Sequence, residues 1–134
     1  MAAAPFDWLE YFRLAHELGG REDEASLRSA ISRAYYCVYH LALARAEANT
    51  YKPLPGESTH LQLWRVFSGS PEPDCQKLAI IAARLKEKRE RADYERYHAR
   101  IAEEVPVLLA DAREFAALLG RLPARHPNPK SMRQ

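Results

Sequence analysis

One stretch of the sequence, residues 27–42, carries a set of polar side chains at helical spacing: Ser29, Arg33, Tyr36 and His40. Arg33 and His40 are seven residues apart, and seven steps of about 100° return almost to the same side of an α-helix. Tyr36 lies on the turn between them, so a guanidinium, a phenol and an imidazole are expected along one helical stripe. A guanidinium binds phosphate oxygens through paired hydrogen bonds, and an imidazole transfers protons near neutral pH. The stripe is therefore the candidate functional site.

The element that positions this stripe is predicted to be the longest helix of the chain, from about Asp23 to Asn49. Residues 27–42 contain neither glycine nor proline, and their apolar side chains recur at helical spacing. Asp23 and Ser26 suit the start of a helix, where side-chain oxygens accept hydrogen bonds from free backbone amides. The apolar positions that indicate the buried face are Ile31, Ala34, Val38 and Leu41.

Apolar spacing also predicts helices before and after this one, separated by loops rich in glycine and proline. Their predicted starts are Pro5, Ser58 or Thr59, Asp74 and Ala99. The predicted fold is all-α, an up-and-down bundle of four to five helices at residues 5–120. A disordered, basic and proline-rich tail is expected at residues 121–134. In the last helix the inward-facing residues are expected to be Ile101, Val105, Leu108, Leu109, Ala112, Phe115 and Leu119.

Length and composition point to one globular domain with a packed core, since the chain has 134 residues of which 47% are hydrophobic. The net charge of +2 is unevenly distributed along the chain. The tail from Arg121 holds four basic residues and no acidic one, which leaves 16 basic against 18 acidic residues in the body. The body is therefore not a basic nucleic-acid platform, and any attraction for RNA must come from a local patch or from the tail.

The chemistry of the remaining residues gives expectations about compartment and ligands. Two cysteines, Cys37 and Cys75, do not make a disulfide framework, which favours a reducing, cytoplasmic environment. No signal peptide and no membrane contact are expected, because no apolar run approaches 18 residues. Neither a P-loop nor a dinucleotide-binding glycine motif is present, so no cofactor is expected. Cys37 and His40, with His60 or Cys75, are the only candidate metal ligands, and they lack a second close pair; no metal is predicted.

Two blocks of the sequence resemble one known family. Ser-Arg-Ala-Tyr-Tyr at residues 32–36, followed by Tyr39 and His40, resembles the HEPN domain (higher eukaryotes and prokaryotes nucleotide-binding). A second block at residues 85–94 ends in Arg-x-x-Ala-Asp-Tyr, which is similar to a later signature of that family. The two blocks occur in the same order and at a similar separation, and the resemblance covers roughly residues 5–120.

The resemblance implies a function for the polar stripe. In HEPN ribonucleases four to six residues separate an Arg from the His that follows it, and six separate Arg33 from His40. These enzymes cut RNA without a metal, so the resemblance implies that Arg33 and His40 are catalytic. These domains dimerise with their helices facing, which implies a homodimer whose cleft holds two Arg33 and two His40 side chains. Such proteins act in toxin–antitoxin or defence systems, in which a nucleotidyltransferase encoded beside them is the implied antitoxin partner.

An alternative without catalysis stays open. In it, Arg33 pairs with Asp93, His40 is a hydrogen-bonded and partly buried residue, and the chain is a HEPN module that binds a partner or a nucleotide. The residue after Arg33 is Ala34, where active nucleases often have a polar residue. Ala42 lies where one toxin branch has a tyrosine that becomes adenylylated, which argues against that form of regulation.

Several further residues are assigned supporting or structural roles. Asp93 is expected to hold Arg33 or the Ser32 hydroxyl, because a buried guanidinium needs a partner. Tyr94 is expected to pack across the bundle, and both residues are named with Ser29 and Tyr36 as supporting residues of the site. Large packing residues with bonded hydroxyls are expected at Tyr35, Tyr36 and Tyr39. Surface positions are expected for His16, His98 and His126.

Overall fold

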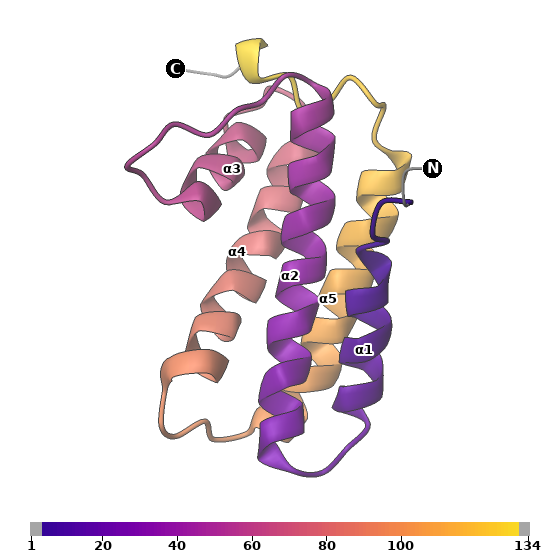
Figure 1. Cartoon of the computed structure of the whole chain (residues 1–134), viewed down its shortest axis with the longest axis vertical. Helices are drawn as coiled ribbons and strands as arrows, with labels where there is room; N and C mark the ends of the chain where they lie inside the picture. Colours follow the sequence, from indigo (N-terminus) through magenta and orange to yellow (C-terminus); the bar gives the residue numbers. More distant parts are fainter. Residues whose placement is uncertain (1–3, 132–134) are drawn as a thin grey trace.

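The computed structural model describes residues 4–131, and all regular secondary structure in this part of the chain is helical, with no strand (Figure 1). The elements are α1 (Leu9–Gly19), α2 (Glu24–Ala48), α3 (Thr59–Ser68), α4 (Pro73–Tyr94), α5 (Ile101–Arg121) and a short 3-10 helix (Pro129–Ser131). The prediction of an all-α fold is confirmed. Among these described helices, none combines the length and the apolar character that crossing a bilayer requires.

Helix α2 lies at the centre of the bundle and packs against α1, α4 and α5. Successive long helices run in opposite directions, and α3 lies beside α4 at the end of the bundle where α2 finishes (Figure 1). Small residues on α2 allow this close approach on several sides, since Ala30, Ala34, Ala42 and Ala46 are all fully buried. The helix that carries the polar stripe is therefore also the helix around which the core is built.

The predicted bounds of α2 and α3 agree closely with the structure because both helices start at side-chain caps. The Asp23 carboxylate accepts a hydrogen bond from the amide of Ser26 at 3.0 Å. The Ser58 hydroxyl accepts one from the amide of Leu61 at 3.3 Å. These short side chains satisfy amides that have no partner within the helix.

Of the predicted helix starts that differ from the structure, those of α1 and α4 differ because of side-chain hydrogen bonds near the first turn. Helix α1 begins at Leu9 instead of Pro5, because the Asp7 carboxylate accepts a hydrogen bond from the Leu9 amide at 3.0 Å. Helix α4 begins one residue before Asp74, at Pro73, and the side chain of the preceding glutamate caps it. Proline is favoured at a first helical position because it has no amide hydrogen that would need a partner there.

Helix α5 presents its predicted inward face to the core. All seven expected residues are buried, and Phe115 is fully inaccessible. Pro106 lies within the helix and has no amide hydrogen to donate. Because Pro106 is exposed, water can donate instead to the carbonyl that its amide would have bonded. The α5 prediction is thus confirmed for the core face, while its bounds move two residues toward the C-terminus.

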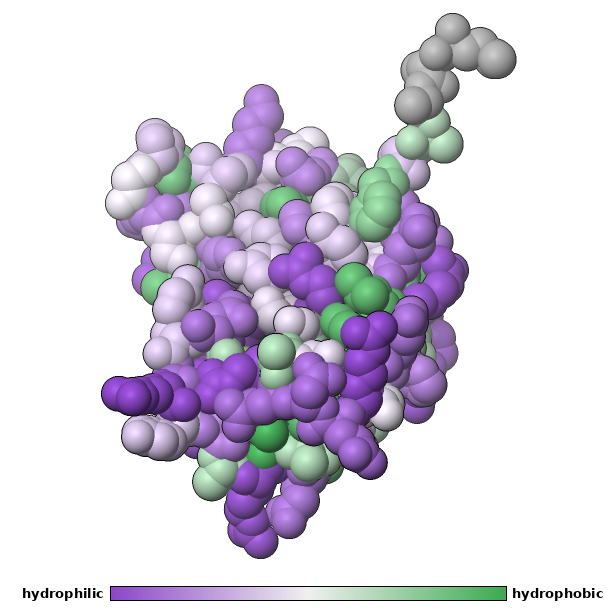
Figure 2. Space-filling view, turned by 60° about the horizontal axis from the view of Figure 1, so that its bottom comes forward, coloured by the Kyte–Doolittle hydropathy of each residue, from purple (hydrophilic) through white to green (hydrophobic). Residues whose placement is uncertain are grey.

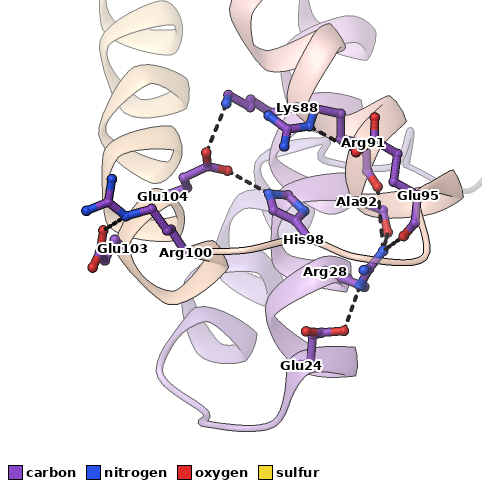
Figure 3. Close-up of polar contacts among 10 residues, drawn as sticks. All are labelled: Glu24, Arg28, Lys88, Arg91, Ala92, Glu95, His98, Arg100, Glu103 and Glu104. Atoms are coloured by element: carbon purple, nitrogen blue, oxygen red, sulfur yellow. Dashed lines mark hydrogen bonds and ion pairs between the residues drawn. The ribbon is translucent and has the colours of Figure 1, made fainter.

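Two arginines of α2 hold the C-terminal ends of its neighbours. Near the start of α2, Arg28 donates to backbone carbonyls at the end of α4, including those of Ala92 at 2.8 Å and Glu95 at 2.6 Å (Figure 3). Near its end, Arg45 donates to the carbonyls of Leu119 at 2.8 Å and His126 at 3.1 Å. The last carbonyls of a helix lack partners and carry partial negative charge, so a guanidinium stabilises them in two ways.

The segment after α5 is attached to the bundle by the second of these arginines. Arg121, where the disordered tail was expected to begin, is the last residue of α5, and Leu122 and Pro127 are buried. Arg45 also donates to the carbonyls of Leu122 and Pro123. Residues 132–134 of the expected tail lie outside the described residues.

The loop between α4 and α5 is held by a histidine that the sequence analysis placed on the surface. His98 is buried, and its Nε2 lies 2.7 Å from a carboxylate oxygen of Glu104, whose other oxygen accepts from Lys88 at 2.9 Å (Figure 3). The surface prediction is wrong for His98 because these partners from α4 and α5 offset the loss of water. The surrounding end of the bundle is mostly hydrophilic, with small separate apolar patches (Figure 2).

We predict that Arg45→Ala lowers the free energy of unfolding by about 1–3 kcal/mol, because it leaves part-buried carbonyls without a donor. Denaturant titration measures this loss, and amide exchange should become faster at residues 122–126. Arg65→Ala is the matched control, since the Arg65–Glu57 pair is exposed and should contribute less than about 1 kcal/mol. Equal losses in the two variants would contradict the attachment.

Candidate functional site

The structure brings charged and aromatic residues from three helices around the ring of Tyr36. The guanidinium carbons of Arg33 and Arg89 lie 5.2 and 5.5 Å from the ring centroid of Tyr36. The imidazole centroids of His40 and His60 lie 6.3 and 6.0 Å from it. We call these five residues the Tyr36 cluster. It contains the predicted pair, Arg33 and His40, together with one residue of α3 and one of α4.

Arg33 is held by aromatic rings instead of a carboxylate. Its guanidinium carbon lies 4.7 Å from the ring centroid of Tyr11 on α1, in addition to its contact with Tyr36. Among residues 4–131 no carboxylate oxygen lies within 4.0 Å of the Arg33 guanidinium, so the expected pairing with Asp93 is not formed. A cation above an aromatic face is stabilised by about 0.5–2 kcal/mol without losing its charge. Arg33 therefore remains available to bind an anion.

Asp93 instead joins α4 to α2 through two other partners. Its Oδ2 accepts from Arg89 at 3.4 Å and from the Ser32 hydroxyl at 3.5 Å. The predicted contact with Ser32 is confirmed, whereas the one with Arg33 is not present. The spacing of Arg89 and Asp93 explains the difference, because residues four apart on a helix are neighbours on its surface.

His40 lies flat against Trp8, just before α1. The two ring centroids are 3.7 Å apart and the rings are inclined by only 8°. Burial lowers the pKa of His40, and the nearby positive charge of Arg33 lowers it further. Neither ring nitrogen of His40 has a hydrogen-bond partner within the described residues. A neutral imidazole with both nitrogens free can accept a proton from a substrate hydroxyl.

His60 is held by a chain of hydrogen bonds that begins in the core. The indole Nε1 of Trp64 donates to the hydroxyl of Tyr35 at 3.1 Å, and this hydroxyl lies 2.6 Å from Nδ1 of His60. Burial raises the pKa of Tyr35 far above its usual value, so the phenol keeps its proton. The His60 ring also stacks on Tyr39 with centroids 4.1 Å apart. The predicted packing role of Tyr35 and Tyr39 is confirmed, since both are buried with bonded hydroxyls.

Arg89 supplies a second positive charge from beneath the cluster. Its side chain is 90% buried, and its Nε has no hydrogen-bond partner within the described residues. Besides Asp93, it contacts the faces of Tyr35 and Tyr36, with its guanidinium carbon 5.3 Å from the Tyr35 ring centroid. A buried guanidinium whose donors are incompletely used increases the positive potential at the cluster.

Two of the predicted supporting residues lie away from this cluster. Tyr94 is 79% exposed, so the prediction that it packs across the bundle is wrong. It is the last residue of α4. Ser29 lies on the expected stripe of α2 but is exposed and forms no hydrogen bond within the described residues.

The sequence analysis assigned no role in the polar site to four of its residues: Trp8, Tyr11, His60, which was considered only as a metal ligand, and Arg89, which was noted only as the first residue of the second family signature. A signal for Arg89 was present, because it follows Leu85 by four residues and precedes Ala92 by three, which places it on the apolar face of α4. An arginine at such a position is a marker of a special environment. For Trp8 and His60 there was no comparable signal, since their partners come from a different helix.

The described residues give no support for a metal centre at this site. Within residues 4–131, no group of three His, Cys, Asp or Glu side chains is arranged to hold a metal ion. Cys37, one of the candidate ligands considered, is buried, and burial raises the pKa of its thiol to about 11. A protonated, buried thiol is a poor metal ligand.

Comparisons with protein-family models, with curated proteins and with solved structures found no match to this chain.

We predict that Arg33→Gln raises the pKa of His40, because it removes the positive charge that disfavours the imidazolium. NMR titration of the histidine ring signals measures this change. A His40 pKa that falls or does not move would show that Arg33 is electrostatically remote.

Proposed function

We propose that this protein is a HEPN-like, metal-independent endoribonuclease that acts as a homodimer, with Arg33 and His40 as its catalytic residues. The observation that carries the proposal is the state of this pair. Arg33 keeps an unneutralised charge, and burial together with that charge lowers the pKa of the neighbouring His40, whose ring nitrogens have no partner among the described residues. This combination suits a phosphodiester, which needs a cation for its oxygens and a proton acceptor for the attacking hydroxyl.

The proposed reaction is an internal transfer at one phosphate of an RNA strand. Arg33 holds the non-bridging oxygens of the scissile phosphate and stabilises the charge that grows on them. One His40 removes the proton of the 2′-hydroxyl, whose oxygen attacks phosphorus. The bond to the 5′-oxygen breaks, and a second imidazole, as imidazolium, gives that oxygen a proton. The products are a 2′,3′-cyclic phosphate and a 5′-hydroxyl.

The homodimer supplies the second imidazole. One His40 provides one proton-transfer group per step, whereas the reaction needs an acceptor and a donor at the same time. A two-fold contact uses the same patch of both chains, so two copies of the α2 stripe would place two Arg33 and two His40 side chains in one cleft. The dimer is therefore part of the proposed chemistry.

Aromatic side chains beside the pair favour a single-stranded substrate. Phe6 is 48% exposed and packs against Trp8 and Tyr11, with ring centroids 5.0 and 5.4 Å away. Exposed ring faces stack on unpaired bases of any sequence, and each such contact contributes about 1–3 kcal/mol. A flexible strand or loop also allows the in-line attack that a regular duplex prevents. These features support a toxin or defence nuclease with RNA as its substrate.

A second candidate is a non-catalytic HEPN-like module that binds a nucleotide or a partner protein, such as a nucleotidyltransferase encoded beside it. The observation that favours this module is that aromatic rings cover Arg33 and His40. Trp8 occupies one face of His40, and Tyr11 lies over Arg33. In this alternative the rings hold a base, and the cluster binds without cutting.

We predict that purified protein cuts unstructured RNA in the presence of EDTA and leaves a 2′,3′-cyclic phosphate. His40→Ala and Arg33→Ala should each reduce the rate by about 10²–10⁴-fold, because each removes a group that acts in the transition state. Gel analysis of end-labelled RNA measures both the rate and the product ends. A 2′-deoxy substitution at the cleavage site should block the reaction, since it removes the nucleophile.

The control for this assay is His16→Ala, which changes an exposed histidine of α1 that is outside the Tyr36 cluster. It should cut as fast as the parent protein. If the parent protein cuts no RNA, or if His40→Ala cuts at the parent rate, the catalytic proposal fails. Retained binding of a nucleotide in that case would favour the non-catalytic module.

We predict that Ser29→Cys forms a disulfide-linked dimer on mild oxidation, because Ser29 is exposed on the same stripe of α2 that would lie at the two-fold axis. Both native cysteines are buried, so only the introduced thiol should react. Ser68→Cys, on the exposed side of α3, is the control and should remain monomeric on a non-reducing gel. A monomeric parent protein in sedimentation, with no cross-link in Ser29→Cys, would contradict the shared cleft.

A further inference from the structure

The ring of His60 has a fixed position beside the proposed catalytic pair. It lies in the first turn of α3 and is stacked on Tyr39, with centroids 4.1 Å apart and planes inclined by 17°. A second parallel ring, Tyr35, lies 5.6 Å away. Contacts on this scale leave an imidazole little freedom to rotate. The direction of its ring nitrogens is therefore part of the fold.

The hydrogen-bond chain behind His60 determines which nitrogen carries the proton. An indole N–H can only donate, so Trp64 uses the Tyr35 hydroxyl oxygen as its acceptor. Among the described residues, Nδ1 of His60, 2.6 Å away, is the only other hydrogen-bond partner of the Tyr35 hydroxyl, so we assign the hydroxyl proton to this contact with Nδ1 as its acceptor. In the neutral ring the remaining proton is on Nε2. This assignment favours the tautomer in which Nε2–H is a donor.

The charged groups around His60 keep the ring neutral. Burial is the largest cause that lowers the pKa of His60. The positive charges of Arg89 and Lys86 on α4 lower it further, as does His40 on α2. Glu90 acts in the opposite direction. In the described part of the chain, Nε2 of His60 has no hydrogen-bond partner. It is also not a fully buried atom, so solvent can reach it. The donor is therefore open to solvent and unused.

We propose that His60 is a phosphate-binding residue of the same cleft, whose Nε2–H donates to an oxygen of the phosphate next to the one that Arg33 holds. This inference deepens the proposed function and depends on the strand crossing the Tyr36 cluster. The rings of Tyr36 and Tyr39 contact both His40 and His60, and so separate the two imidazoles along the surface. One strand that passes over the partly exposed ring of Tyr36 presents successive phosphates to the two histidines.

The test uses a 2′-deoxy oligonucleotide of unstructured sequence, which the proposed reaction cannot cut because it lacks the nucleophile. Affinity is measured by fluorescence anisotropy at several salt concentrations. His60→Ala should weaken binding about tenfold, the effect of losing one hydrogen bond to a charged acceptor. His60→Gln, which keeps an N–H near the position of Nε2, should recover part of this loss. His16→Ala is the matched control and should bind like the parent protein.

The salt dependence of binding shows whether His60 binds phosphate as a neutral hydrogen-bond donor or as a cation. Because His60 carries no charge, its removal should leave the slope of log affinity against log salt unchanged. Arg33→Ala should reduce the same slope by about 0.7, the contribution of one phosphate contact on a single strand. A slope that falls in His60→Ala would mean that the ring binds as an imidazolium, which would overturn the inference.

The tautomer is measured directly in the free protein. The ¹⁵N signals of the His60 ring should show Nε2–H and a bare Nδ1 in the parent protein. Tyr35→Phe keeps the aromatic ring but removes the hydroxyl, so it should allow the other tautomer and weaken binding of the deoxy strand. Trp64→Phe should have a smaller effect in the same direction. Thermal unfolding of each variant verifies that the bundle is intact.

The outcomes distinguish this inference from the proposed catalysis. If the deoxy strand binds and His60→Ala weakens it, while no RNA is cut, the inference stands and the catalytic proposal fails. If RNA is cut but His60→Ala binds and cuts like the parent protein, the inference fails and the catalytic proposal stands. An Nδ1–H tautomer for His60 in the free protein, or no binding of the strand to the parent protein, would also overturn it.

Discussion

The bundle depends on the hydrogen bonds that two arginines of α2 make to the ends of neighbouring helices. A helix ends in carbonyls that have no partners of their own, and burying them against another helix costs free energy unless a donor is supplied. Arg28 supplies it for α4 and Arg45 for α5. Because both come from the central helix, the positions of α4 and α5 are both fixed relative to α2. These contacts therefore also fix the geometry of the Tyr36 cluster, which joins α2 to α4.

The electrostatics of the cluster follow from the way its two guanidinium groups are solvated. Arg89 has a carboxylate partner, Asp93, and is buried. Arg33 instead contacts aromatic rings, which stabilise a cation without neutralising its charge. The charge lowers the pKa of the neighbouring His40 and remains available to an anion. An acidic partner for Arg33 would have given a more ordinary structural contact and a less reactive surface.

Local sequence patterns predicted the helix that carries the site to within one residue at each end, because caps and apolar spacing are local properties. They failed where partners come from a distant part of the chain. His98 looked like a surface histidine because Glu104 and Lys88, which bind it, belong to α5 and α4. Arg33 seemed to need Asp93, because nothing local indicated that Tyr11 of α1 would cover it. Contacts between helices depend on packing angles that periodicity does not specify.

The two tryptophans of the chain are divided between the surface of the site and its support. Trp8 lies against His40, whereas Trp64 is buried and donates to Tyr35. Each indole therefore has its own optical environment, one sensitive to the protonation and occupancy of the site and the other to the integrity of the core. The natural fluorescence of this small protein contains two separate reporters, and replacing either tryptophan with phenylalanine leaves the other to be read alone.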